Sequence, residues 1–238
     1  MLKSIEGIVT RTTRYGETSV ILDLLSPEQG LQSFIISGVR KKSGKKKSAM
    51  VRVLNIVKAE AYVKDNDRLS RIKEISYAHI YQSIPFDIVK STIATFIIEV
   101  CRKTVKASDD YSEVYHYIIK GLIHLDNTSE GLAHFHIGFL LGLTKHLGIA
   151  IQNNYTPTSP YFNMKDGTFE ASRSDHRYTL SSETSYHLAQ YNTNTSYQGA
   201  NRTERQEIIK GIVDFYQYHI EGFGELKSLD ILFTLFSD

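Results

Sequence analysis

The chain of 238 residues contains one cysteine, four prolines and no tryptophan. Because Cys101 has no partner thiol, neither an intrachain disulfide nor a four-cysteine zinc site is possible. No apolar run reaches the roughly 18 residues that a membrane-spanning helix needs. The opening sequence MLKSIEGIVT lacks the apolar stretch of a signal peptide. These absences predict a cytoplasmic protein that does not enter a membrane.

Motifs for catalysis are missing as well. The sequence contains neither a G-x-S-x-G nucleophile elbow nor an H-E-x-x-H metal-binding pattern. His134 and His136 stand two positions apart, so a helix would point their rings in different directions. We interpret both as satisfied or surface side chains, and Cys101 as a buried or half-buried small residue. The sequence therefore predicts no catalytic residues, no metal and no cofactor, and hence a protein that is not an enzyme.

Charge is divided unevenly along the chain. Residues 1–80 hold 15 Lys and Arg against 8 Asp and Glu, a net charge of +7. Residues 81–238 hold 13 against 18, a net charge of −5, and the two parts add to the formal +2 of the whole chain. A basic first third joined to an acidic remainder indicates two roles, one of which involves a polyanion.

Most of the positive charge is concentrated in Gly38–Ser48, here called the basic segment. Six of the eight residues from Arg40 to Lys47 are Lys or Arg. On a nucleic acid these side chains would neutralise phosphates and release counterions; an equally open alternative is a solvated, disordered loop. The segment is not a Walker phosphate loop, because five residues separate Gly38 from Gly44 where four are needed. In addition, we expect a strand rather than a helix to follow it.

Residues 1–80 are predicted to form short strands with no helix among them. Runs rich in Val, Ile and Leu are separated by turns that contain Gly or Asp. Five strands in so short a stretch favour a small closed barrel. Tyr15, Phe34 and Tyr62 are either part of its packing or rings on which bases stack. The expected strands span Ser4 to Thr13, Thr18 to Leu25, Gly30 to Val39, Val51 to Val63 and Arg68 to Ala78, with a turn at Asp65 to Asp67 before the last.

After Pro85 the apolar residues recur with helical spacing. We expect Ser129 to cap one helix, Gly148 to end it in a left-handed conformation, and Thr203–Gln206 to form a capping box. Residues 149–180 are irregular and are predicted to contain a hairpin closed by the two-residue turn Asp166–Gly167. The expected helices span about Phe86 to Lys106, Tyr111 to Leu125, Ser129 to Leu147, Ser182 to Gln190, Thr203 to His219 and Ser228 to Phe236.

Several short motifs, taken in order, resemble the RecO family of bacterial recombination mediators in DNA repair. Their order and spacing cover nearly the whole chain, although each motif alone is loose. The motifs are Gly7-Ile8-Val9, Arg14 to Ser19, Gly30-Leu31, Gly38-Val39-Arg40, Phe135 to Gly148 ending in Leu147-Gly148, Arg205 to Tyr218, and Leu226 to Leu229.

The resemblance implies an α+β protein with two domains. Residues 1–80 would form a basic, DNA-binding, five-stranded OB-fold barrel. Residues 81–238 would form a mainly α-helical domain with a small metal-free β-hairpin in residues 149–180. Many members of the family carry a four-cysteine zinc site after the central helix, but residues 151–178 of this chain contain no cysteine. Zinc is therefore not expected here.

The implied function is DNA repair by homologous recombination after DNA damage. The protein would bind single- and double-stranded DNA, anneal complementary strands, and help load recombinase onto DNA coated with single-strand-binding protein. Its partners would be RecR and the acidic C-terminal tail of single-strand-binding protein, and it would be associated with the bacterial nucleoid in the cytoplasm. The residues predicted to bind nucleic acid are Arg14, Tyr15, Arg40, Lys41, Lys42, Lys45, Lys46 and Lys47.

Two alternatives remain open from the sequence. One is a non-enzymatic RNA-binding or structural adaptor that uses the same basic barrel. The other is an enzyme with a site in the helical part, although no group of residues favours it. For the acidic tail we expect a local pocket that combines cations with apolar side chains. The candidate cations are Arg102, Lys103, Lys120 and Lys145.

Overall fold

The computed structural model describes residues 1–63, 69–106, 111–173, 177–194 and 196–236. Contacts divide the chain into two compact units. The barrel unit comprises residues 1–87 and 98–126, and the helical unit comprises residues 88–97 and 127–238. Each unit therefore contains two separate stretches of the chain, and the boundary predicted at residue 80 remains a prediction. None of the described helices combines the length and hydropathy needed to span a bilayer.

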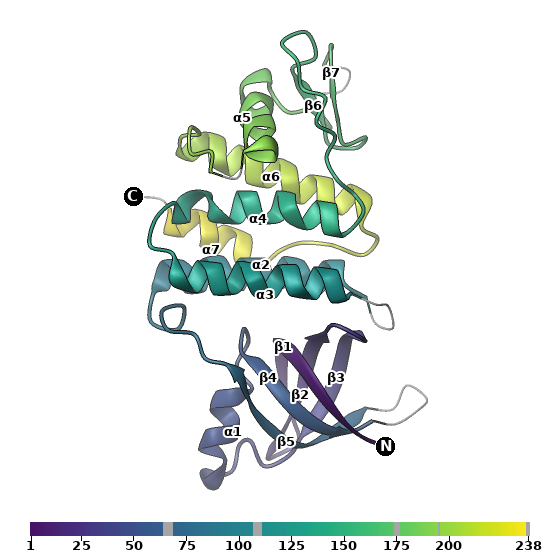
Figure 1. The fold of residues 1–238 in the computed structure, drawn as a ribbon, viewed down its shortest axis with the longest axis vertical. Helices are drawn as coiled ribbons and strands as arrows, with labels where there is room; N and C mark the ends of the chain where they lie inside the picture. The colour runs from purple at the N-terminus through teal and green to yellow at the C-terminus, as the bar shows by residue number, and fades with distance from the viewer. Residues whose placement is uncertain (64–68, 107–110, 174–176, 195, 237–238) are drawn as a thin grey trace. The chain divides into compact units, whose positions relative to one another are not determined.

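The strands of the barrel unit close into a five-stranded barrel in the order β1-β2-β3-β5-β4 (Figure 1). Neighbouring strands are antiparallel except β3 and β5, which pair in parallel. Apolar residues such as Val9, Leu22 and Phe34 point into the barrel and are almost completely buried. This arrangement confirms the predicted OB-fold. The strands are β1 (Leu2–Tyr15), β2 (Ser19–Ser26), β3 (Gly30–Ile36), β4 (Ile56–Tyr62) and β5 (Ser70–His79).

The expectation that no helix interrupts the strands was wrong. A 3-10 turn, η1 (Lys42–Gly44), and a short helix, α1 (Lys45–Met50), occupy most of the basic segment, and the chain turns through residues 51–55 before β4 begins. Met50 anchors α1 because its side chain is buried, and the amide of Asn55 donates to the carbonyl oxygens of Ala49 and Met50. Burial and capping thus override the β-propensity of Val51 and Val53. The turn predicted at Asp65–Asp67 lies outside the described residues.

Helix α3 (Ser112–Asn127) completes the barrel unit together with the last part of α2 (Ile88–Thr104). The buried carboxylate of Asp126 accepts hydrogen bonds from the backbone N–H groups of Gln82, Ser83 and Ile84 at 2.7–2.8 Å. Burial alone would raise the pKa of Asp126, but these bonds and the Ser83 hydroxyl outweigh it and lower the pKa below its usual value. The ionised carboxylate therefore fixes the segment that follows β5 to the end of α3.

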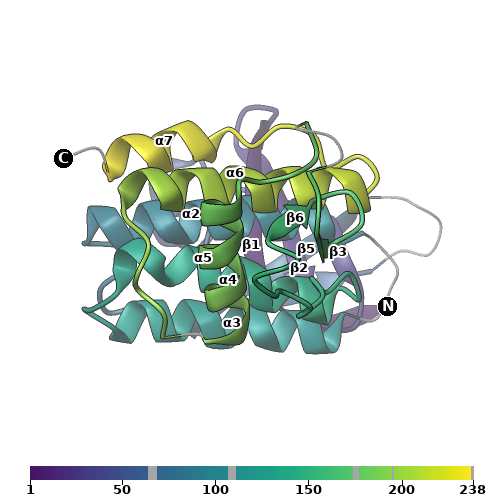
Figure 2. The same ribbon diagram turned by 90° about the horizontal axis from the view of Figure 1, so that it is seen from above.

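The helical unit packs its helices around a shared apolar core. Helices α4, α5 and α6 contact one another, and α5 runs across the direction of α4 and α6 (Figure 2). Tyr216 is completely buried and donates its hydroxyl hydrogen to the carbonyl oxygen of Leu140 at 2.9 Å. Besides residues 88–97 of α2, the elements are α4 (Leu132–His146), β6 (Tyr161–Asn163), β7 (Thr168–Glu170), α5 (Ser182–Thr193), α6 (Arg202–His219) and α7 (Ser228–Leu235).

Two predicted helix caps were wrong in position. Gly131, rather than Ser129, is the N-cap of α4, and it adopts a φ of 66° with no side-chain capping bond. The capping box of α6 is formed by Asn201 and Glu204, two residues before the predicted one. Gly148 has the expected positive φ of 72°. At the start of α6 the pattern Asn201–Glu204 overlaps the predicted pattern Thr203–Gln206, and the helix uses the earlier one.

The predicted hairpin is present as the β6–β7 pair, but its turn is longer than expected. Asn163 pairs with Thr168, so Met164 to Gly167 form the turn rather than Asp166–Gly167 alone. The side chain of Asn163 closes the turn by donating to the Asp166 carboxylate and accepting from the Lys165 backbone N–H. Phe162 is completely buried, and its ring lies 6.2 Å from that of Phe215 in α6. Aromatic packing therefore holds the hairpin on the helices.

Candidate nucleic-acid interface

The basic segment is an ordered part of the barrel unit. Gly38, with a φ of 78°, turns the chain out of β3, and the backbone N–H of Gly44 donates to the Lys41 carbonyl at 2.8 Å. Gly44 is buried against the backbone of Gly38 and Val39, where any side chain would collide. This close approach holds the turn together and places the lysines of η1 and α1 on its outside.

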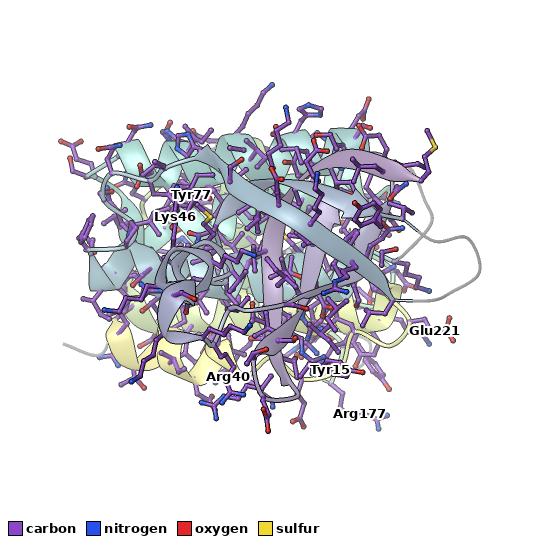
Figure 3. The ribbon with its side chains drawn as sticks, turned by 90° about the horizontal axis from the view of Figure 1, so that it is seen from below. Tyr15, Arg40, Lys46, Tyr77, Arg177 and Glu221 are labelled. Carbon is purple, nitrogen blue, oxygen red and sulfur yellow. The ribbon has the colours of Figure 1, made fainter. Side chains whose placement is uncertain are left out.

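An open groove of about 610 Å³ runs between α1 and β5. A second hollow of about 350 Å³ shares Ser37, Lys47 and Lys73 with it, so the two form one feature that we call the α1–β5 groove. In the view of Figure 3, Lys46 of α1 and Tyr77 of β5 are labelled in the same part of the barrel unit. Its charged and aromatic lining residues are Lys41, Lys46, Lys47, Tyr62, Arg71, Lys73 and Glu74.

Cations dominate the lining of this groove. Among its described lining residues Glu74 is the only carboxylate, and it lies 3.6 Å from the ammonium of Lys73. Both side chains are well exposed, so this ion pair is weak. Arg71 donates to the hydroxyl of Ser37 at 3.2 Å, which fixes its guanidinium at the wall of the groove. The groove is therefore suited to a polyanion.

The predicted binding residues divide into two groups. Lys41, Lys46 and Lys47 line the α1–β5 groove, whereas Lys42 and Lys45 are exposed in the same segment without lining it. Arg14 and Tyr15 are exposed at the end of β1, and Arg40 is bound to the turn that follows them, so we call these three residues the β1–β2 turn site.

The β1–β2 turn site is held together by the backbone. The guanidinium of Arg40 donates to the carbonyl oxygen of Gly16 at 3.1 Å, and the backbone N–H of Arg40 donates to the carbonyl oxygen of Thr18. Figure 3 shows Arg40 and Tyr15 along one edge of the barrel unit, apart from Lys46 and Tyr77. Arg40 therefore belongs to the turn, although the next residue, Lys41, belongs to the groove.

The three aromatic residues suggested for base stacking have different positions. Phe34 is 1% exposed and is part of the barrel core, so it does not offer a stacking surface. Tyr62 is 47% exposed and lines the α1–β5 groove, while Tyr15 is 51% exposed at the β1–β2 turn. Each group of cations thus includes one exposed tyrosine, the combination with which proteins bind single strands.

Sequence reasoning did not identify Arg71 and Lys73 as candidates. They lie in β5, far along the chain from the basic segment, and only the barrel pairing brings them beside α1. A signal was nevertheless present, because two cations two positions apart in a predicted strand share a face.

A smaller cavity lies in the helical unit. It has a volume of about 10 Å³, and it is lined by Arg202, Arg205, Leu232, Phe233 and Phe236 among others. The ring of Phe236 stacks on that of His136 with centroids 5.8 Å apart. The cavity combines cations with apolar side chains, as expected for a tail-binding pocket, and none of the four cations suggested by the sequence lines it.

The remaining candidates for chemistry form no reactive group. Cys101 is completely buried, as predicted, and burial raises the pKa of its thiol far above the usual value. His134 pairs through Nδ1 with the hydroxyl of Tyr191 at 2.5 Å, so it is satisfied as predicted. His136 is buried without a hydrogen-bond partner among the described residues, so that interpretation was wrong. The described residues also contain no group of three or more His, Cys, Asp or Glu side chains able to hold a metal ion.

Comparison with known proteins relates both units to one family. Residues 1–81 match the family described as Recombination protein O N terminal, and residues 85–230 match Recombination protein O C terminal. DNA repair protein RecO of Bacteroides fragilis is 31% identical over 242 residues, which cover 99% of this chain and 100% of that protein. DNA repair protein RecO of Flavobacterium psychrophilum is 31% identical over 239 residues, covering 98% of both chains. The chain belongs to the RecO family of DNA repair proteins.

Proposed function

We propose that this protein is a recombination mediator that binds single- and double-stranded DNA, anneals complementary strands and helps load recombinase onto DNA coated with single-strand-binding protein. Membership of the RecO family supports a role in DNA repair. The α1–β5 groove is the observation that carries the proposal for DNA. It joins lysines from α1 and β5 to an exposed tyrosine ring.

The side chains of the groove are suited to binding DNA independently of its base sequence. Lys side chains contact phosphates, which carry no sequence information, and a tyrosine ring stacks on any base. A mediator requires such binding because damaged DNA has no fixed sequence. Cations on one surface also screen the repulsion between two strands, which lowers the barrier to annealing.

The test is a strand-annealing assay with complementary oligonucleotides coated with single-strand-binding protein, with and without RecR. We expect the protein to accelerate annealing and RecR to alter the loading of recombinase. Affinities for single-stranded DNA and RNA of equal length are measured in parallel. A strong preference for RNA without annealing of DNA would favour the RNA-binding adaptor instead.

The small cavity in the helical unit supports a second part of this proposal, the docking of the acidic tail of single-strand-binding protein. Arg202 and Arg205 would face its carboxylates, and Leu232 and Phe233 would face its apolar side chains. Lys210 adds a further cation, 5.5 Å from the centre of the Phe233 ring. At about 10 Å³ the cavity has room for roughly one water molecule. An incoming side chain would therefore have to displace a lining side chain, and we propose Phe236, which follows the end of α7.

This competition predicts that Phe236→Ala strengthens binding of a tail peptide, whereas Arg202→Glu weakens it. Affinity is measured by fluorescence anisotropy of a labelled peptide on the full chain. Lys58→Glu, an exposed change of the same charge on β4, is the control and should leave the affinity unchanged. Equal affinities for all four proteins would exclude this cavity as the docking site.

A further inference from the structure

The cations of the barrel unit form two groups that the sequence presents as one. The α1–β5 groove contains Lys41, Lys46 and Lys47 with Arg71 and Lys73. The β1–β2 turn site contains Arg14 and Arg40, and the guanidinium of Arg40 is bound to the Gly16 carbonyl. Figure 3 shows the labelled members of the two groups, Lys46 and Arg40, on different parts of the unit.

Each group has the components of an independent site for a single strand. The groove offers Tyr62 and the turn site offers Tyr15, and about half of each side chain is exposed. Stacking on such a ring holds a base, while the nearby cations hold the phosphates.

We propose that the barrel unit binds two single strands at the same time, one in the α1–β5 groove and one at the β1–β2 turn site. This inference rests on the proposed DNA-binding function and specifies how annealing takes place. The basic segment, which contributes to both sites, would lie between the strands. Its exposed Lys42 and Lys45 would then screen the repulsion between the two backbones while the bases search for their partners.

The number of strands bound per chain tests this proposal directly. Full-length protein is titrated with an oligothymidylate of about eight nucleotides, within the roughly 4–16 nucleotides that an OB-fold engages. Because thymidylate does not pair with itself, each bound molecule reports a separate site. Analytical ultracentrifugation at saturating oligonucleotide should give two per chain. Counting per chain makes the result independent of the oligomeric state.

Three double variants remove the same charge from different places. Lys46→Gln with Lys73→Gln affects the groove, and Arg14→Gln with Arg40→Gln affects the turn site. Lys58→Gln with Lys120→Gln, exposed cations of β4 and α3 that belong to neither site, is the matched control from the same unit. We expect one oligonucleotide per chain for the first two variants and two for the control, with circular dichroism confirming that all three fold.

Glu74 provides a test in the opposite direction. Its carboxylate pairs with Lys73 and faces the strand proposed for the groove. Glu74→Gln should therefore strengthen binding at low salt by roughly two- to fivefold, and the gain should vanish at high salt. The gain should be lost when Lys46 and Lys73 are also replaced.

The outcomes separate this inference from the function on which it rests. One oligonucleotide per wild-type chain together with intact annealing would overturn two-strand binding and leave the proposed function standing. The same reduction in all three double variants would also overturn it, because it would show diffuse attraction rather than two sites. Absence of any oligonucleotide binding by the wild-type chain would remove the proposed function and this inference together.

Discussion

At the scale of single residues, His136 stands out because its ring is buried without satisfying either nitrogen. It is 1% exposed, and no described residue forms a hydrogen bond with Nδ1 or Nε2. Burial, with smaller contributions from Arg205 and His134, lowers its pKa to about 3. The ring is therefore neutral at pH 7. A buried polar group without a partner costs about 1–3 kcal/mol, so this position reduces stability even before it binds a proton.

The low pKa of His136 predicts an acid-sensitive fold. Between pH 6.5 and about 3 the unfolded chain binds a proton at this position that the folded chain does not. The free energy of unfolding should thus fall as the pH falls, by about 1.4 kcal/mol per pH unit for this group. His136→Phe should remove that part of the slope, as measured by urea unfolding between pH 6 and pH 4.

A comparison at His134 shows whether the effect is specific. Burial and then Arg205 lower the pKa of His134 to about 4, so His134→Phe should also flatten the acid slope. However, it should lower stability at pH 7 because it removes the hydrogen bond with Tyr191. Parallel pH curves for wild-type protein and His136→Phe would contradict the assignment of a buried neutral ring.

At the scale of secondary-structure elements, the basic segment carries the clearest prediction. Replacing Arg40, Lys41, Lys42, Lys45, Lys46 and Lys47 by Gln should weaken binding to single-stranded DNA steeply. If about three to five of them meet phosphates, the dependence of the logarithm of affinity on the logarithm of salt concentration should lose roughly 0.7 per contact. Fluorescence anisotropy at several salt concentrations measures the slope.

The same substitutions should leave the fold intact, because α1 is held by other residues. Met50 is buried, and Asn55 bonds to the carbonyl groups at the end of the helix. Thermal unfolding followed by circular dichroism checks this point. A variant that keeps its stability and also keeps the wild-type salt slope would show that the basic segment does not contact DNA.

The strands and most helices could be predicted from the sequence because their signals are local. Runs of Val, Ile and Leu between turns mark β2 and β3, and apolar residues at helical spacing mark α2 to α4. Helix α1 could not be predicted in this way. It is held by the burial of Met50 and by the hydrogen bond from the Asn55 side chain, and both depend on tertiary structure.

The candidate site shows the same limit. The lysines of the basic segment are evident from composition, but their division between two sites depends on how the chain turns at Gly38 and binds Arg40 to the β1–β2 turn. Arg71 and Lys73 join the groove only through strand pairing across the barrel. The number of cations can therefore be read from the sequence, whereas which cations share one surface can be known only from the fold.

At the scale of the whole molecule, we predict that the protein holds no stoichiometric zinc. Residues 151–178, where the family resemblance raised the question of a zinc site, contain no cysteine and are fixed by other contacts. Phe162 packs on Phe215, Tyr178 contacts Tyr218 at 5.4 Å, and Asn163 closes the hairpin turn. Metal analysis should find no zinc, and the thermal unfolding temperature should not change in chelator. One zinc per chain with loss of structure on its removal would refute this.

The hydrogen bonds that Asp126 accepts from Gln82 to Ile84 affect the order in which the barrel unit can fold during synthesis. Gln82 to Ile84 follow directly after the barrel strands, yet the carboxylate that satisfies their N–H groups comes more than forty positions later. Tyr111 likewise returns to donate its backbone N–H to Pro27. When synthesis has reached only the end of β5, the N–H groups of Gln82 to Ile84 therefore still lack the carboxylate that they bind in the folded protein. Translation must continue into the last turn of α3 before the barrel unit can form all of these hydrogen bonds.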